Sequence, residues 1–181
     1  RDVERSRGLG DVYKRQVYLN LLETLDRRDI AVTEAEPGTR YTLGSARLDI
    51  LGPAKMFEEK NNQSVVCALT FGERRFLFMG DAEKEAENAL LSAGCDLSAD
   101  WIKLGHHGSS SSSRRAFLEH VSPETAVITC GAGNSYGHPH EETLDTLRAL
   151  DIVWYRSDRD GTIVTACDGK TIRVMTERNG D

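Results

Sequence analysis

The sequence has no long apolar run, no dense basic run and no paired cysteine motif. Nothing approaches 18 consecutive apolar residues, so no transmembrane helix is predicted, and the first residues do not resemble a secretory signal. The formal charge is −6, whereas proteins that hold duplex DNA by neutralising phosphates alone are usually more basic. This balance weakens the case for a nucleic-acid substrate, although metal ions in a cleft would still attract a phosphodiester locally.

The four cysteines show neither a Cys-x-x-Cys pair nor zinc-ribbon spacing. Cys67, Cys130 and Cys167 lie in apolar, strand-like runs, so we expect buried free thiols that pack as small hydrophobic side chains. Free thiols favour a reducing compartment.

The length of 181 residues, with 39% hydrophobic and 29% charged residues, fits one globular domain or part of one. Residues 1–16 are polar and lack a helix or strand period, and residues 11–16 (DVYKRQ) match the translation of a sequencing-library adapter. An ordinary charged tail is the alternative. We therefore expect residues 1–16 to be non-native and residues 17–181 to be a partial domain whose upstream part is missing. Residues 1–16 hold five basic and three acidic residues, so the remainder carries a charge of −8.

The rest of the chain alternates between short apolar runs and helical periods. Helices are predicted over 17–29, 81–93, 114–121 and 141–150. Strands are predicted over 41–43, 46–51, 64–71, 74–79, 100–104, 125–130, 152–155, 162–167 and 171–175. The early strands form hairpins and the later ones alternate with helices, a pattern typical of mixed sheets with helices on the outside.

A Gly80-Asp81 pair follows one apolar strand and precedes a predicted helix. A carboxylate that leaves the end of a strand suits metal binding. An aspartate at this position also suits the cap of the following helix. Both interpretations stay open, because a carboxylate has two oxygens.

Adjacent histidines follow the next apolar strand, and Gly105 and Gly108 flank them. All five histidines lie within the 35 residues from His106 to His140. Neighbouring side chains point in different directions, so one of His106 and His107 can bind a metal while the other faces the substrate. A pair of solvated loop histidines is the alternative. Imidazole and carboxylate delivered to one cleft favour a metal-dependent hydrolase.

The segment 134–140 (NSYGHPH) follows the 125–130 strand and precedes a helix. We expect His138 at the mouth of the sheet, where it either protonates a leaving group or binds a metal. We expect His140 to belong to the start of the helix and His120 to be structural.

Two further features carry weaker signals. Arg156 lies in a polar turn between two strands and is of the residue type that reaches phosphates, although a plain acidic hairpin loop is the alternative. Ser109 lies beside His107, but a serine nucleophile is disfavoured because a Gly-x-Ser-x-Gly motif is absent.

Residues 46–174 resemble the C-terminal half of the metallo-β-lactamase-fold domain of ComEC-type competence (DNA-internalisation) proteins and their stand-alone relatives. The order and spacing of five segments carry the resemblance. These are 62–66 (NQSVV), 78–83 (FMGDAE), 102–109 (IKLGHHGS), 134–140 (NSYGHPH) and 155–162 (YRSDRDGT).

The resemblance implies an α/β (α+β) fold, namely the C-terminal half of a four-layer αββα sandwich with mixed sheets. It implies a metal-dependent hydrolase of phosphodiesters, with single-stranded DNA as the substrate in the ComEC context. It also implies fusion to, or association with, a membrane channel domain, which would place the domain on the extracytoplasmic face of the membrane. If the chain is not such a domain, a cytoplasmic or secreted location is the alternative.

The resemblance also implies roles for individual residues. Asp81 resembles the carboxylate that bridges two metals, and His107 resembles a ligand of one of them. His106 and His138 would line the reaction centre as catalytic residues. The residues expected to contact substrate are Ser109, Asn134 and Tyr136.

The sequence departs from the family where the family places most of its ligands. No histidine precedes His106, so the early His-x-His-x-Asp-His motif is absent. An intact protein would hold two divalent metal ions, zinc or manganese. Because catalytic zinc usually has three or more protein ligands, we expect this chain to bind metal weakly or not at all and to show little activity.

Two other functions compete with this one. A non-catalytic interaction module would keep half of the sandwich without its chemistry. A hydrolase of small or cell-wall phosphodiesters is mildly favoured over a DNA enzyme by the charge of −8 outside residues 1–16.

Overall fold

The computed structural model describes residues 16–178, in two units that divide between residues 34 and 35. The first unit contains a helix over residues 16–27, where a helix was predicted over residues 17–29. The segment predicted to be non-native lies outside the described residues except for Gln16. No described helix is long and apolar enough to cross a membrane. The second unit is described below by itself.

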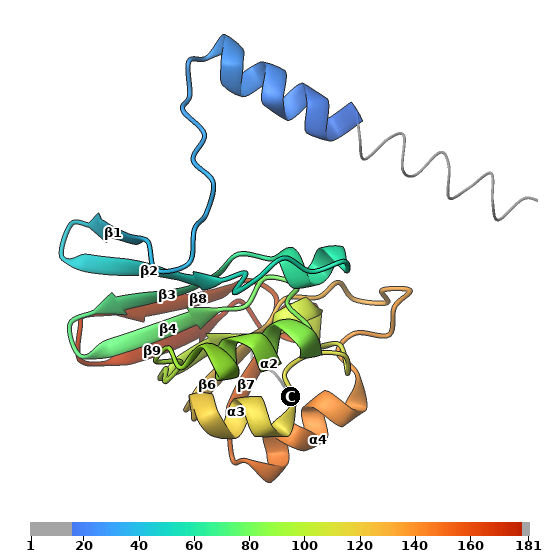
Figure 1. Cartoon of the computed structure of the whole chain (residues 1–181). Helices are drawn as coiled ribbons and strands as arrows, with labels where there is room; N and C mark the ends of the chain where they lie inside the picture. Colours follow the sequence, from blue (N-terminus) through green and yellow to red (C-terminus); the bar gives the residue numbers. More distant parts are fainter. Residues whose placement is uncertain (1–15, 179–181) are drawn as a thin grey trace, which may run out of the picture. The chain divides into compact units, whose positions relative to one another are not determined.

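A seven-stranded mixed sheet forms the centre of the second unit, and its strand order follows the chain from β1 to β7 (Figure 1). Strands β1 to β4 pair in antiparallel fashion, and β4 to β7 pair in parallel. The strands are β1 (Arg40–Leu43), β2 (Ala46–Gly52), β3 (Val66–Phe71), β4 (Arg74–Phe78), β5 (Trp101–Lys103), β6 (Thr125–Ile128) and β7 (Val153–Arg156). A separate antiparallel pair consists of β8 (Ile163–Cys167) and β9 (Ile172–Thr176).

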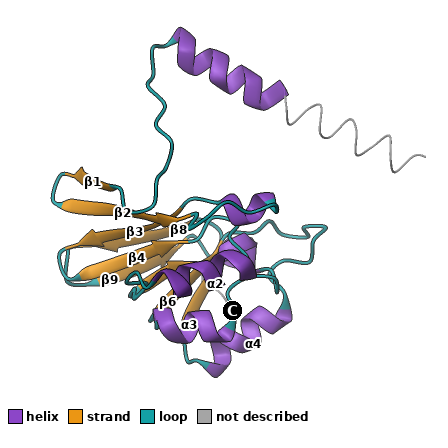
Figure 2. Cartoon of the chain, viewed as in Figure 1, coloured by secondary structure: helices purple, strands orange, loops and turns teal. Residues whose placement is uncertain are grey.

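Three helices gather on one face of the large sheet, as Figure 2 shows. They are α2 (Lys84–Ala93), α3 (Arg115–Val121) and α4 (Glu141–Ala149). Short turns of helix complete the unit, namely η1 (Lys60–Gln63), η2 (Gly105–Gly108) and α5 (Ser157–Asp160). The mixed sheet, the helical layer and the second sheet confirm the predicted fold class.

The strand residues divide between the two faces by strict alternation. Leu77 and Ile102 point to the helical face and are fully buried with the side chains of α2, α3 and α4. Phe76, Trp101 and Val127 point to the other face and pack against β8 and β9. Central strands buried on both faces read as continuous apolar runs, and the sequence shows such runs here.

Most predicted elements exist with ends shifted by a few residues. The tight turn between β3 and β4 is confirmed, and Gly72 adopts a φ of 59° there. Gly94 ends α2 in the left-handed conformation, as predicted.

The segment predicted to be a polar turn between the strands 152–155 and 162–167 contains the short helix α5. A plain hairpin is excluded, because β7 and β8 belong to different sheets and α5 lies between them. Arg156 pairs with Asp158, its guanidinium 2.6 Å from the carboxylate, so its charge is used within the turn. The four cysteines are free, as expected, but all are half-buried, so the expected burial of Cys67, Cys130 and Cys167 was wrong.

The parallel pairing of β4, β5 and β6 brings three loops to one edge of the sheet. The three strands run in the same direction and end at this edge, so the segments that follow them lie next to one another. Asp81 follows β4, His106 and His107 follow β5, and His138 lies in the loop after β6. The topology therefore collects the candidate residues from three separate stretches of sequence.

A buried carboxylate on α2 links this helix to the segment that precedes α3. Glu87 on α2 is fully buried and accepts hydrogen bonds from the Ser113 backbone N–H and, at 3.2 Å, from the Arg114 guanidinium. Burial raises the pKa of Glu87, and the bonds from Ser113 and Arg114 oppose that rise. The contact ties α2 to the start of α3.

We predict that Glu87→Ala lowers the free energy of unfolding by about 2–4 kcal/mol, because it leaves the buried Ser113 N–H and the half-buried Arg114 guanidinium without this acceptor. Glu87→Gln keeps an acceptor oxygen without a charge and should cost less. Glu119→Ala, which removes an exposed pair with Arg115, should change stability by less than about 1 kcal/mol. Urea unfolding measures the free energy of unfolding of the three variants. Equal losses of stability for Glu87→Ala and Glu119→Ala would contradict the prediction.

Candidate metal centre

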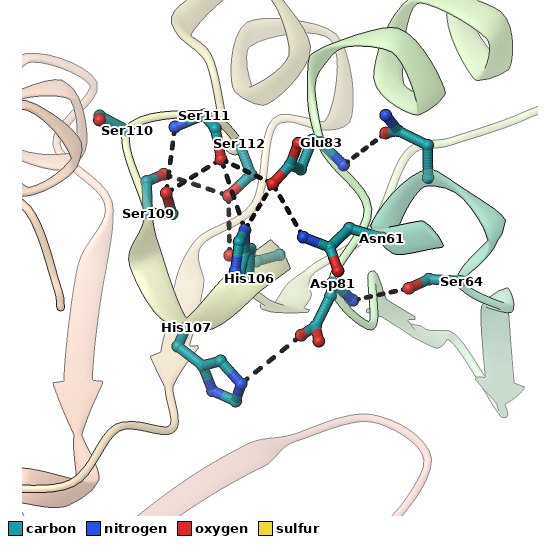
Figure 3. A network of polar contacts seen from close by, with 12 residues as sticks. Asn61, Ser64, Asp81, Glu83, His106, His107, Ser109, Ser110, Ser111 and Ser112 are labelled. Atoms are coloured by element: carbon teal, nitrogen blue, oxygen red, sulfur yellow. Dashed lines mark hydrogen bonds and ion pairs between the residues drawn. The ribbon is translucent and has the colours of Figure 1, made fainter. Parts of the chain in front are cut away.

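Asp81 and His107 face each other at the sheet edge. The Nε2 atom of His107 lies 3.5 Å from an Asp81 carboxylate oxygen, and each side chain is a little under half exposed. Figure 3 shows the two side chains pointing toward one another from the segments after β4 and β5. The sequence predicted this pairing of carboxylate and imidazole, and the structure brings the two together.

The hydrogen bond on the far side of His107 decides which nitrogen is free. Its Nδ1 lies 2.5 Å from the carbonyl oxygen of Thr129, just beyond β6. A carbonyl oxygen only accepts, so Nδ1 carries the proton and the neutral ring keeps its lone pair on Nε2. Metal-binding histidines are commonly held by a carbonyl or carboxylate in this way. The lone pair of His107 is thus aimed at Asp81.

Asp81 does not cap the helix that follows it. The start of α2 is capped by Asn62, whose side-chain oxygen accepts the Glu83 N–H at 3.0 Å and the Ala86 N–H at 3.2 Å. The Asp81 N–H itself donates to the Ser64 hydroxyl. The sequence left two roles open for Asp81, metal binding and helix capping, and Asn62 of η1 performs the capping. The carboxylate of Asp81 is left for another role.

His106 turns away from His107 into a separate polar network (Figure 3). Its Nδ1 lies 2.7 Å from a Glu83 carboxylate oxygen, which also accepts hydrogen bonds from Asn61 and Ser111, both at 3.1 Å. Because a carboxylate only accepts, the Nδ1 of His106 carries a proton. Sequence reasoning missed Glu83, since an acidic residue before a helix is an ordinary feature.

The divergence of the two histidines follows from their backbone. His106 and His107 both adopt left-handed conformations, with φ of 44° and 55°. Such angles are uncommon outside glycine, and consecutive examples mark local strain that the surrounding structure must enforce. Gly105 and Gly108 permit the turn, since a Cβ atom would lie 2.6 Å from the Ala82 carbonyl and 2.7 Å from Pro139 respectively.

His138 completes a group of rings at this edge. Its ring centroid lies 5.3 Å from that of His106 and 6.4 Å from that of His107, and it stacks on the latter at 20°. Burial lowers the pKa of His138, and the nearby His140, His106 and His107 lower it further. The neutral ring therefore predominates at neutral pH.

The residues expected to contact substrate occupy different environments. Ser109 is buried, and its hydroxyl pairs with Ser111 at 2.9 Å inside the serine loop. The side-chain amide of Asn134 bonds to the backbone of its own loop, at the His138 N–H and carbonyl. Tyr136 is 76% exposed at the rim.

The other two histidines lie beside or within helices. His140 lies directly before α4, as expected, but its side chain makes no cap hydrogen bond to that helix, and its Nδ1 accepts the Ser110 N–H at 3.0 Å. His120 lies exposed on α3.

The donors present fit part of a metal site. An aspartate oxygen and an oriented imidazole nitrogen suit zinc or manganese. Within residues 16–178, however, no group of three or more histidine, cysteine, aspartate or glutamate side chains is arranged to hold a metal ion. Among the described residues Asp81 and His107 are a pair of candidate ligands, whereas a catalytic site usually has three or more.

Several known proteins are similar to this chain. The chain is similar to ComE operon protein 3 of Bacillus subtilis (strain 168), at 33% identity over 79% of this chain and 19% of that protein. It is similar to competence protein ComA of Neisseria gonorrhoeae, at 37% identity over 58% of this chain and 15% of that protein. It is also similar to recombination protein 2 of Haemophilus influenzae, at 31% identity over 58% of this chain and 12% of that protein.

The chain thus spans less than a fifth of the length of each of these relatives. A family model described as the metallo-beta-lactamase superfamily matches residues 6–132, which is more than half of the chain. The chain therefore belongs to the metallo-beta-lactamase superfamily.

Proposed function

We propose that this chain is part of a metal-dependent phosphodiesterase that acts on DNA during competence. The observation that carries the proposal is the Nε2 of His107, oriented by Thr129 and facing the Asp81 carboxylate at 3.5 Å. This is a half-exposed pair of metal-binding atoms at the edge where three parallel strands end.

In this proposal Asp81 and the Nε2 of His107 hold a divalent ion, zinc or manganese. Further protein ligands have to come from outside the described residues, and we propose that they are encoded upstream of residue 17. When bound, such ions supply a nucleophile at neutral pH and neutralise charge on the phosphoryl oxygens. An upstream frame that encodes His-x-His-x-Asp-His supports this proposal, and a frame without it supports the non-catalytic module.

His106 and His138 are the proposed proton-transfer residues. Glu83 holds the Nδ1 proton of His106, which fixes the ring against the serine loop and leaves its Nε2 edge for the substrate. The largely neutral His138, 5.3 Å away between ring centroids, shares the same rim. Protonation of the leaving oxygen by one of these rings lowers the barrier to P–O cleavage.

The choice of DNA as substrate rests on the relatives. Two of them carry names that refer to competence or to the ComE operon. We propose the same context for this chain, with the domain joined to a membrane channel domain as in a ComEC-type protein, on the extracytoplasmic face of the membrane. The net charge favours substrate capture at a local metal site over capture by a broad basic surface.

We predict weak metal binding by the 181-residue chain. Calorimetric titration with Zn²⁺ should give an affinity far below the ~10–16 kcal/mol of structural zinc sites, because Asp81 and His107 alone do not close the coordination shell. Asp81→Asn and His107→Gln should each abolish this binding. His120→Gln, on the exposed face of α3, is the matched control and should change nothing. A tight site, or binding that survives both variants, would refute the assignment.

We predict phosphodiester cleavage from a version extended upstream to include the proposed further ligands. Single-stranded DNA should be cut faster than a chromogenic small phosphodiester. Asp81→Asn and His107→Gln should reduce the rate to background, and His106→Gln should reduce it by about 10²–10⁴-fold. Steady-state rates on both substrates measure this. Faster cleavage of the small diester would favour the alternative of a small or cell-wall substrate, and no cleavage of either would favour the interaction module.

A further inference from the structure

A cavity of about 420 Å³ opens beside the proposed metal centre. His107 lies on its border, and Tyr136, His138, Cys130 and Ser157 are among the residues that line it. Its volume falls within the ~300–1,000 Å³ typical of small-molecule sites. None of its lining residues is an aspartate, glutamate, lysine or arginine. The cavity therefore suits an uncharged group, although it adjoins a centre that attracts anions.

Three rings lead from the surface to the centre. Tyr136 stacks on His138 with ring centroids 5.7 Å apart and an angle of 23° between the planes. His138 in turn stacks on His107, at 6.4 Å and 20°. The planes are nearly parallel, in the offset arrangement that aromatic rings prefer. The series ends at the imidazole whose Nε2 faces Asp81.

Tyr136 is exposed on a well-held loop. Its carbonyl oxygen accepts the Nε2 proton of His140 at 3.1 Å, because the Nδ1 of that ring is already an acceptor for Ser110. Asn134 clamps the same loop through both the N–H and the carbonyl of His138. The backbone is thus fixed on both sides of a ring that is 76% exposed. Folding makes little use of that ring, so it is available to a ligand.

We propose that Tyr136 and His138 form a stacking subsite for a nucleobase next to the scissile phosphodiester. This inference deepens the proposed function and rests on it for the position of the phosphate. A base is a flat, uncharged aromatic group attached to an anion, which matches an uncharged cavity beside a metal centre. Stacking on aromatic side chains is how proteins hold single strands without reading their sequence.

The subsite should show little preference among bases. The Asn134 amide bonds to its own loop, and the Ser157 hydroxyl donates to the Cys130 carbonyl at 2.8 Å and accepts the Cys130 N–H at 2.9 Å. With these polar groups engaged, the cavity offers ring faces in place of hydrogen bonds to base edges. Every base has such a face, so stacking tolerates them all.

The test is nucleoside binding by the 181-residue chain, and the NMR chemical shifts of its aromatic side chains report the binding. Adenosine and thymidine are the probes, and ribose is the base-free comparison, so neither phosphate nor metal is needed. Tyr136→Ala should weaken nucleoside binding by roughly 5- to 100-fold. Tyr136→Phe keeps the ring face and should bind within roughly twofold of the parent. Tyr41→Ala, on the edge strand β1, is the matched control and should bind like the parent.

The outcomes separate this inference from the proposed function. Nucleoside binding that depends on an aromatic residue at 136, with no binding of ribose, supports the subsite whatever the metal titration gives. Absence of binding at millimolar nucleoside, or equal binding by Tyr136→Ala, overturns the subsite and leaves the phosphodiesterase proposal to its own tests. A strong preference for one nucleoside would overturn the stacking account, because stacking alone does not produce it.

Discussion

The parallel pairing of β4, β5 and β6 is the constraint on which the candidate site depends. Parallel strands send their following segments to one edge, so Asp81, His107 and Thr129 meet there although up to 48 residues separate them. The alternation of buried residues along these strands fixes their register, since a shift by one residue would exchange Leu77 with Phe76 between the two cores. Packing of both faces therefore also positions Asp81 and His107.

The polar network around Glu83 shows what that packing supports. One Glu83 carboxylate oxygen, at the start of α2, accepts from Asn61 of η1 and from His106 and Ser111 of the segment after β5. A partly buried carboxylate is stabilised only when such donors surround it, so the network orders all three segments together. The left-handed backbone at the two histidines is strained, and the network and the sheet are the surroundings that hold it in place.

The sequence predicted the elements and the central pair but not the partners that orient them. Apolar runs and turn residues located the strands, and the order of Asp81 and His107 after neighbouring strands indicated their convergence. Thr129 orients His107 through its backbone carbonyl, and such a contact cannot be predicted from the residue type. Asn62 caps α2 from 21 residues away, and this contact exists only after η1 packs against the helix. The helix α5 was missed because its four residues carry the composition of a polar turn.

One backbone turn assigns different tasks to adjacent identical residues. Because both histidines are left-handed, their rings diverge, and each Nδ1 finds a different acceptor, Glu83 for His106 and Thr129 for His107. The Glu83 carboxylate fixes the His106 ring beside the serine loop, next to His138. The Thr129 carbonyl fixes the tautomer of His107, whose Nε2 faces Asp81. The acceptors that the fold supplies therefore distinguish two residues that the sequence alone leaves equivalent.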